Sequence, residues 1–120
     1  MARTVQEIMN RELFGVRPEL PLAEARGFFR SLHVGAAPVL DEARRPLGVL
    51  SVRDVLDGDG TAGERMTKPA ICVGVSTSIE EAARRLAQTS MHHLIVVDGG
   101  GTAVGIVSTL DVARILAVGD

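Results

Sequence analysis

One seven-residue phrase with chemically useful side chains occurs twice in this sequence. It reads Gly48-Val49-Leu50-Ser51-Val52-Arg53-Asp54, and 57 residues later Gly105-Ile106-Val107-Ser108-Thr109-Leu110-Asp111. In both copies a glycine and two aliphatic residues precede a serine, two variable residues and an aspartate. The apolar run predicts a strand and the following residues predict a helix, so the serine and the aspartate are expected at a helix N-terminus.

The residue types at this junction suit a ligand that carries ribose and phosphate. A helix N-terminus offers free backbone N–H groups and a partial positive charge, and both favour phosphate. The serine hydroxyl adds a donor, and an aspartate one turn into the helix can accept hydrogen bonds from two ribose hydroxyls. The glycine lets another backbone or a ligand come close.

The same residues have a purely structural interpretation. Ser-x-x-Asp before an apolar helix is a capping arrangement, with Ser51 or Ser108 at the N-cap and Asp54 or Asp111 at N3. Repetition in both halves follows from duplication and does not by itself indicate a ligand. The two interpretations are compatible.

The phrase belongs to a longer internal repeat. An ungapped shift of 57 residues places Ala25 on Ala82 and Asp41 on Asp98, and apolar positions agree more widely still. Two unrelated segments would rarely hold register over a whole half without a gap. The sequence therefore predicts two copies of one unit.

Each repeat is expected to have the element order β-α-β-β-α, which is an α+β (mixed α/β) fold. We expect a first repeat over 1–57, a linker over 58–61 and a second repeat over 62–120. A unit of about 60 residues buries only about 60% of its unfolded surface. The repeats are therefore expected to share one core around a pseudo-twofold axis.

The expected elements of a repeat are a short helical entry, an extended stretch, an amphipathic helix, a hairpin and a closing helix. They fall at 5–9, 13–16, 22–32, 38–50 and 52–56, and at 63–66, 70–75, 79–86, 94–107 and 109–116. Ser78 followed by Glu81 predicts a capping box at the start of the second amphipathic helix.

Composition excludes several classes of function. With 46% hydrophobic and 23% charged residues and a net charge of −2, the chain is globular and has no basic excess for nucleic acid. The longest aliphatic run, Leu94–Val97, is far shorter than a membrane span. Aromatic residues make up 2%, so recognition of a base by stacked rings is not expected.

The single cysteine, Cys72, allows no intrachain disulfide, and the N-terminus has no secretory pattern, so a cytoplasmic location is expected. His92 and His93 have no third ligand at suitable spacing, so no metal site is expected.

The duplication, the closing phrase and the opening Val5-x-x-Ile8-Met9 together resemble a cystathionine β-synthase (CBS) domain pair. The resemblance runs from about Val5 to Leu116. It implies two units packed through their strands, with two clefts that bind AMP, ADP, ATP or S-adenosylmethionine. It implies no required cofactor, and it implies a homodimer, because such pairs commonly form a flat disc.

The resemblance also implies which residues line the two clefts. One cleft is closed by Asp111 and draws on Ile106, Val107, Ser108 and Leu110, with Phe14, Val34 and Gly35 on its base side. The other is closed by Asp54 and draws on Val49, Ser51 and Arg53, with Ala70, Ile71 and Met91 on its base side.

Two adjacent histidines make the clefts unequal. Members of the family that hold phosphate often have a basic residue just before the second strand, where this chain has His92 and His93 in one repeat but Gly35 and Ala36 in the other. The family's geometry implies that His93 faces the Asp54 cleft, beside Arg53. Phosphorylated ligands are therefore expected to prefer that cleft.

Three functions compete at this point. The first is a nucleotide sensor whose ligand-driven change is read by a protein partner that the sequence does not identify, and the second is a ligand-free assembly module. An enzyme ranks last, because the sequence has no Ser-His-Asp order and no P-loop. Apolar helix faces around Phe28, Phe29 and Leu86 are expected to exceed what one copy buries, which favours a homodimer.

Overall fold

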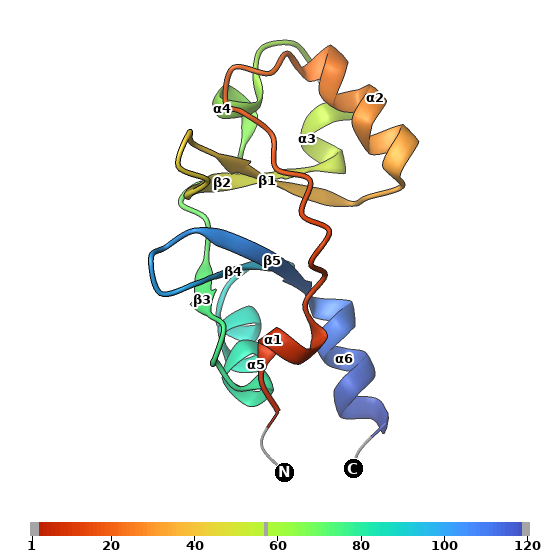
Figure 1. Ribbon diagram of the computed structural model, residues 1–120. Helices are drawn as coiled ribbons and strands as arrows, with labels where there is room; N and C mark the ends of the chain where they lie inside the picture. The colour runs from red at the N-terminus through yellow and green to blue at the C-terminus, as the bar shows by residue number, and fades with distance from the viewer. Residues whose placement is uncertain (1–2, 57, 119–120) are drawn as a thin grey trace. The chain divides into compact units, whose positions relative to one another are not determined.

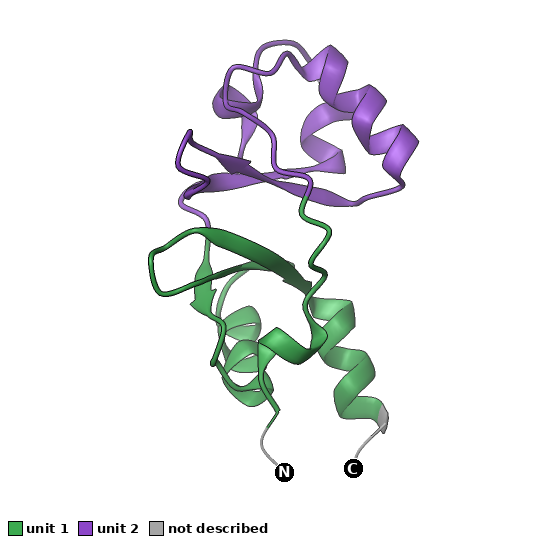
Figure 2. Ribbon diagram, in the orientation of Figure 1, with its two compact units in different colours: residues 1–13, 71–120 green, residues 14–70 purple. Residues whose placement is uncertain are grey.

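The computed structural model describes residues 3–56 and 58–118, which form two compact units (Figures 1 and 2). Unit 1 comprises Met1–Leu13 and Ile71–Asp120, and unit 2 comprises Phe14–Ala70. Asp57, in the expected boundary between the repeats, lies outside the described residues, as do 1–2 and 119–120. The entry helix expected at 5–9 therefore belongs to the same unit as most of the second repeat. The entry helix expected at 63–66 belongs to the same unit as most of the first repeat.

The elements follow the expected order and confirm the predicted α+β class. They are α1 (Val5–Ile8), α2 (Leu22–Leu32), β1 (Ala36–Leu40), β2 (Pro46–Ser51), α3 (Val52–Leu56), α4 (Ala62–Arg65), β3 (Cys72–Gly74), α5 (Ile79–Gln88), β4 (His93–Val97), β5 (Ala103–Ser108) and α6 (Thr109–Val118).

Unit 2 is built on the antiparallel hairpin β1–β2, with α2 and α3 on one side of it (Figure 1). Leu22, Ala25 and Phe29 recur at helical spacing along α2 and are buried. They pack with Leu50 of β2 and Val55 of α3 in one apolar cluster. The position of α3, directly after β2, is therefore set by the same core that holds the hairpin.

Unit 1 has a three-stranded sheet in the order β3-β4-β5, with β3 parallel to β4 and β4 antiparallel to β5. Ile79, Ala82 and Leu86 form the buried stripe of α5. Val5 and Met9, from the start of the chain, belong to the same apolar cluster. Residues near the N-terminus therefore complete the core of the second repeat.

The extended stretch at 13–16 is not the strand that the sequence predicts. Only Val16 forms a parallel bridge, donating its N–H to the Pro38 carbonyl at 2.9 Å and accepting from the Leu40 N–H at 2.9 Å. The next residue to donate in such a ladder is Pro18, which has no N–H. The matching segment of unit 1 has no proline there and forms β3.

Two further expectations are corrected at the helices. Ser78 Oγ accepts from the Glu81 N–H at 3.0 Å, but the Glu81 carboxylate bonds to Arg84, so only half of the predicted capping box is present among the described residues. Phe29 and Leu86 are only 5% and 7% exposed, because each packs into the core of its own unit. These two residues therefore give no support to a homodimer, whereas Phe28, the third residue of that expectation, is 51% exposed.

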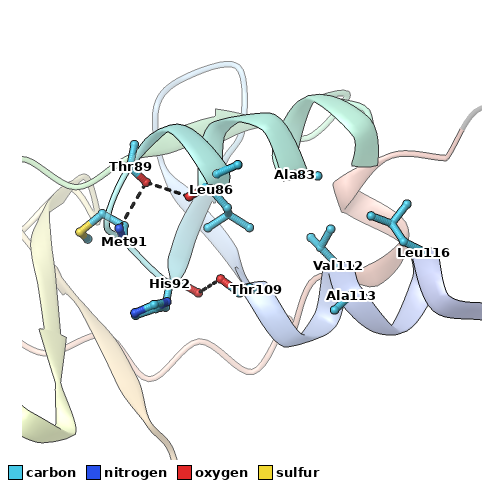
Figure 3. A pocket seen from close by; sticks show the side chains of 10 residues that line it. Ala83, Leu86, Thr89, Met91, His92, Thr109, Val112, Ala113 and Leu116 are labelled. Carbon is cyan, nitrogen blue, oxygen red and sulfur yellow. Dashed lines mark hydrogen bonds between the residues drawn. The ribbon is translucent and has the colours of Figure 1, made fainter.

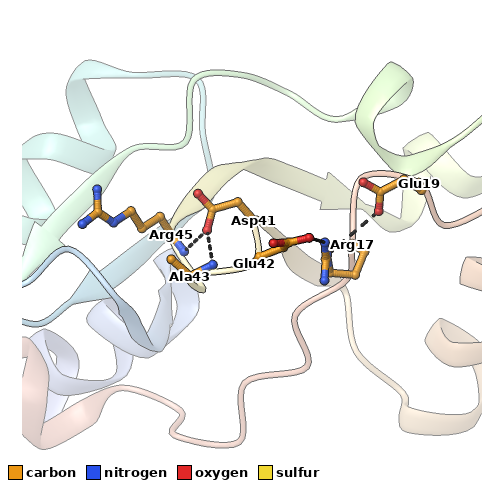
Figure 4. Close-up of polar contacts among 6 residues, drawn as sticks. All are labelled: Arg17, Glu19, Asp41, Glu42, Ala43 and Arg45. Atoms are coloured by element: carbon orange, nitrogen blue, oxygen red, sulfur yellow. Dashed lines mark hydrogen bonds and ion pairs between the residues drawn. The ribbon is translucent and has the colours of Figure 1, made fainter.

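The two hairpin turns share one construction, shown for the first in Figure 4. Asp41 Oδ1 accepts from the N–H groups of Ala43 at 2.8 Å and Arg45 at 2.9 Å. Asp98 Oδ1 accepts in the same way from Gly100 at 2.9 Å and Thr102 at 3.0 Å. The aspartates that the repeat aligns are therefore turn residues. The ion pair of Arg17 with Glu42 is exposed and adds little to the stability of the fold.

The glycine of each phrase permits close contact with the entry segment of the same unit. A Cβ on Gly48 would lie 2.6 Å from the Thr67 carbonyl oxygen and 2.7 Å from Met66 Sδ. A Cβ on Gly105 would collide with the side chain of Met9. Next to Gly48, the Val49 N–H donates to the Thr67 carbonyl at 3.0 Å, and the Thr67 N–H donates to the Val49 carbonyl at 2.9 Å.

We predict that Gly48→Ala destabilises the protein by about 1–3 kcal/mol, because the added methyl meets backbone that cannot move freely. Gly105→Ala should cost less, since the methyl meets only the flexible Met9 side chain. Gly27→Ala in α2 is the control: a Cβ there has nothing within 4 Å, and the change should stabilise by up to about 1 kcal/mol. Urea denaturation followed by circular dichroism measures all three, and equal effects at Gly48 and Gly27 would contradict the prediction.

Candidate functional site

Both Ser-x-x-Asp phrases form reciprocal caps, which confirms the structural interpretation. The Ser51 N–H donates to Asp54 Oδ2 at 2.8 Å, and the Asp54 N–H donates to Ser51 Oγ at 3.3 Å. The Ser108 N–H donates to Asp111 Oδ2 at 2.8 Å, and the Asp111 N–H donates to Ser108 Oγ at 3.0 Å. Two backbone donors that the first turn leaves free are thus satisfied at each junction.

Capping uses only one oxygen of each carboxylate. Ser51 Oγ also donates to Asp54 Oδ2, at 2.9 Å, so all contacts of that carboxylate converge on one atom. From the residues that the structure describes, Oδ1 of Asp54 and Oδ1 of Asp111 receive no hydrogen bond. Both aspartates are half-buried, so each junction presents one carboxylate oxygen that can accept hydrogen bonds.

The choice of aspartate sets these junctions apart from other helix starts in the chain. At α1 the Thr4 N–H donates to the Glu7 carboxylate at 3.0 Å, and at α4 the Thr61 N–H donates to the Glu64 carboxylate at 2.9 Å. Glutamate is the usual partner in a capping box. Capping alone therefore does not explain why both junctions carry the shorter side chain.

Unit 2 contains an apolar cavity that includes two residues expected on the base side of a cleft. It has a volume of about 110 Å³ and is lined by Phe14, Gly15, Val16, Phe28, Phe29, Leu32, Val34 and Ala37. Phe28, which is 51% exposed, was not among the expected ligand residues. In the sequence, Phe28 directly precedes Phe29 but is not one of the buried residues of α2, and this pattern could have indicated an exposed phenylalanine.

The remaining residues expected around the cleft closed by Asp111 are divided between the two units. Gly35 is exposed, and its carbonyl accepts from the Val52 N–H at 3.0 Å. Ile106 exchanges backbone hydrogen bonds with Asn10, Val107 is buried, and Leu110 is exposed. Ile106, Val107, Ser108, Leu110 and Asp111 belong to unit 1, whereas Phe14, Val34 and Gly35 belong to unit 2, so the grouping of this set stays a prediction.

The residues expected around the cleft closed by Asp54 are divided between the two units in the same way. Val49 is buried in β2, and Arg53 is exposed at the second position of α3. With Ser51, Asp54 and Ala70 they belong to unit 2, whereas Ile71 and Met91 belong to unit 1. The Ile71 carbonyl accepts from the Ile95 N–H at 2.9 Å, and the Met91 N–H donates to Thr89 Oγ1 at 3.3 Å. This grouping also stays a prediction.

His93 lies beside the Asp111 junction. It begins β4 directly opposite Ser108, and opposed residues of an antiparallel pair project from the same face of the sheet. Burial lowers the pKa of His93 below its usual 6.5, His92 lowers it further, and Asp111 opposes both. The orientation of the His93 side chain toward the Asp54 cleft stays an untested expectation.

A larger cavity lies between α5 and α6 (Figure 3). It has a volume of about 370 Å³ and is lined by Ala83, Leu86, Ala87, Thr89, Met91, His92, Thr109, Val112, Ala113 and Leu116. Most of these side chains are apolar, and Leu116 is 53% exposed. The cavity includes Met91 and His92 of the expected ligand residues but neither aspartate.

Other chemical groups are sparse in the described part of the chain. There, no group of three or more His, Cys, Asp or Glu residues could hold a metal ion. Burial raises the pKa of the Cys72 thiol, and the charge of Arg85 opposes this only in part. Within residues 3–56 and 58–118, every helix is too short or too polar to cross a membrane.

The sequence of both repeats matches one family model. The CBS domain model matches residues 5–59 and again 62–118. The chain belongs to the CBS domain family. The family-model match therefore confirms the resemblance drawn from the duplicated phrase.

Relatives and solved structures extend this result. An uncharacterized 17.7 kDa protein of Acidianus ambivalens is 29% identical over 97% of this chain and 74% of its own. CBSX2 of Arabidopsis thaliana, solved in complex with AMP, is 29% identical with a TM-score of 0.84, covering 96% of both chains. The cytosolic domain of the Mg²⁺ channel MgtE, solved in complex with ATP, is 33% identical with a TM-score of 0.80, covering 90% of this chain and 46% of that one.

The chain spans only a part of some relatives. It is 34% identical to MgtE of Thermus thermophilus over 91% of its own length but 26% of the transporter. The similarity therefore concerns the CBS pair and not the transport activity of the whole protein.

We predict that Asp111→Ala lowers the free energy of unfolding by about 1 kcal/mol, because the Ser108 N–H loses its acceptor at the start of a ten-residue helix. Asp111→Glu should keep most of that stability, since glutamate serves the same function at α1 and α4. Urea denaturation followed by circular dichroism compares the two variants. An unchanged free energy of unfolding in Asp111→Ala would show that the cap does not stabilise α6, and an equal loss in both variants would show that glutamate cannot replace aspartate there.

Proposed function

We propose that this CBS pair is a regulatory module that binds an adenine nucleotide or another adenosyl ligand at its two Ser-x-x-Asp junctions. One observation carries the proposal: each aspartate caps its helix with Oδ2 and leaves Oδ1 without a donor among the described residues. Ribose presents two adjacent hydroxyls, which are donors of the kind that this oxygen lacks.

Other groups of the chain suit the remaining parts of such a ligand. The first turns of α3 and α6 offer backbone N–H groups and a partial positive charge to phosphate. Phe14, Phe28 and Val34 offer an apolar surface to a base. With neither Trp nor Tyr in the chain, recognition is proposed to depend on ribose and phosphate, with the base against Phe and aliphatic groups.

The relatives support the class of ligand. CBSX2 was solved with AMP and the MgtE domain with ATP, and both are more than 25% identical to this chain. AMP, ADP, ATP and S-adenosylmethionine share the adenosine group that the junctions are proposed to hold. We keep the two residue sets of the sequence analysis as the proposed ligand contacts, and no further cofactor is part of the proposal.

The proposed regulation follows from a difference in affinity. A ligand changes the population of two states only if it binds one of them more tightly. A protein partner would then bind the favoured state, and the module itself would carry out no reaction. Because adenine nucleotides are metabolites of the cytoplasm, we propose that the protein acts there.

A second candidate function is assembly without a ligand, which the cavity between α5 and α6 favours. We propose that a second copy of this chain covers the cavity, giving a homodimer. The 57-residue shift places Arg26 and Arg30 of unit 2 where unit 1 has Ala83 and Ala87. The apolar surface is thus specific to unit 1, where it can meet the same surface of another copy.

AMP, ADP, ATP or S-adenosylmethionine should raise the melting temperature, because a ligand at 100 times its Kd adds about 2.7 kcal/mol. Asp54→Glu and Asp111→Glu keep a capping carboxylate but displace Oδ1 by one methylene. We therefore predict that each weakens binding at its junction about ten- to a hundredfold, the effect of losing a hydrogen bond to a charged group. Calorimetry measures the affinities, and mass spectrometry of the purified protein identifies any bound nucleotide.

Glu64→Ala is the matched control for this experiment. It removes the capping box of α4, which lies outside both junctions, so it should lower stability and leave ligand affinity unchanged. If millimolar concentrations of all four compounds leave the melting temperature unchanged, the assembly function replaces the sensor. Unchanged affinity in both glutamate variants would show that the junctions are caps alone.

We predict that Leu116→Asp converts the homodimer to a monomer, because it places a carboxylate in an apolar contact. Leu56→Asp is the control, since Leu56 is 69% exposed on α3 and does not line the cavity. Sedimentation velocity from micromolar to millimolar concentration measures the mass. A wild-type species of 12.7 kDa throughout this range would exclude the homodimer.

A further inference from the structure

The two junctions share their caps but differ in the basic group that each carries. In unit 2, Arg53 is the second residue of α3, between Ser51 and Asp54. The matching residue of unit 1 is Leu110, which has no charge. The Asp54 junction therefore has a cation at every physiological pH, whereas α6 supplies none in its first turn.

Unit 1 has a titratable side chain beside its junction, on β4, in place of an arginine on the helix. His93 is opposite Ser108 in the β4–β5 register, and the matching pair in unit 2 is Ala36 opposite Ser51. The side chain of His93 is half-buried beside the junction. A histidine at the Asp111 junction thus corresponds to a methyl group at the Asp54 junction.

The charges around His93 are few. Among the described residues, the titratable groups that act on the imidazole are His92, which precedes it, and Asp111, from the first turn of α6. Asp111 Oδ2 is already occupied by the Ser108 N–H. The capped carboxylate is therefore not enough to keep His93 protonated at neutral pH, and the pKa of His93 stays below 6.5.

We propose that binding of a phosphorylated adenosine ligand at the Asp111 junction is coupled to protonation of His93, whereas binding at the Asp54 junction is not. This inference rests on the proposed function and assigns His93 to the Asp111 junction, in place of the Asp54 cleft that the family resemblance implied. When the ribose is bound by Asp111, its 5′-phosphate lies within a few bonds of the same junction, where His93 supplies the basic side chain.

The sign of the coupling follows from the charges. A phosphate dianion favours the protonated imidazole and raises the pKa of His93 in the complex above its value in the free protein. The complex then holds more protons than the free protein, so binding takes up protons and tightens as the pH falls. Adenosine lacks the phosphate and gives no such coupling. Arg53 remains charged throughout, so the other junction has no protein side chain whose protonation is coupled to the ligand, and the titration of the phosphate itself is common to both junctions.

The test is calorimetry on the full chain with AMP and with adenosine, at pH 6 and pH 8, in two buffers of different ionisation enthalpy. The wild type is compared with His93→Gln, His93→Asn and the control His33→Asn. His33 is an exposed histidine with φ 54° at the end of α2, a conformation that asparagine tolerates. Because the phosphate of AMP titrates identically with every variant, the ratio of wild-type to variant affinity isolates His93.

Lowering the pH from 8 to 6 should strengthen AMP binding by the wild type and by His33→Asn about tenfold more than by either His93 variant. Proton uptake should accompany AMP but not adenosine, and Asp111→Glu should remove it while Asp54→Glu leaves it in place. AMP binding with the same pH dependence in wild type and His93 variants would overturn this inference and leave the proposed function intact. Absence of binding by both compounds at both pH values would overturn both.

Discussion

The reciprocal hydrogen bonds between serine and aspartate at the two strand–helix junctions are the contacts on which the fold and the proposed site both depend. Each pair ends a buried strand and begins a helix within four residues, and it satisfies two backbone donors that the first helical turn leaves free. Since Oδ2 is fixed by the Ser51 or Ser108 N–H, the carboxylate cannot rotate freely. Oδ1 is therefore held in one direction before a ligand arrives, which reduces the entropy that binding has to overcome.

Duplication explains why the junctions are alike, and later divergence explains how they differ. The capping pairs, the turn aspartates Asp41 and Asp98, and the glycines of the phrase keep the same structural function in both units. Side chains next to these positions are freer to change, because no buried hydrogen bond depends on them. One unit has Arg53 where the other has the apolar Leu110, and the cap is formed in both. Two sites of one geometry can thereby acquire different charge.

The sequence was sufficient for features that depend on local patterns. Helical spacing of Leu22, Ala25 and Phe29 identified α2, and the repeated phrase located both caps. It was insufficient where tertiary structure decides. Pro18 ends a ladder whose partner strand is more than twenty residues away, and Glu81 bonds to Arg84 in place of its own N-cap. Leu86 is buried in the same apolar cluster as Val5 and Met9, a long-range association that no local pattern encodes.

Helix α6 connects the proposed ligand junction with the proposed dimer surface. Asp111 lies in its first turn, and Val112, Ala113 and Leu116 line the cavity between α5 and α6. A ligand that binds the capping carboxylate adds contacts at the N-terminus of the same helix whose other face would meet a second copy. If dimerisation alters how α6 packs on α5, linkage requires that the ligand and the second copy change each other's affinity by the same factor. Among the described residues, the five-residue helix α3 of unit 2 lines neither of these two cavities, so the Asp111 junction is where ligand binding and assembly can be coupled.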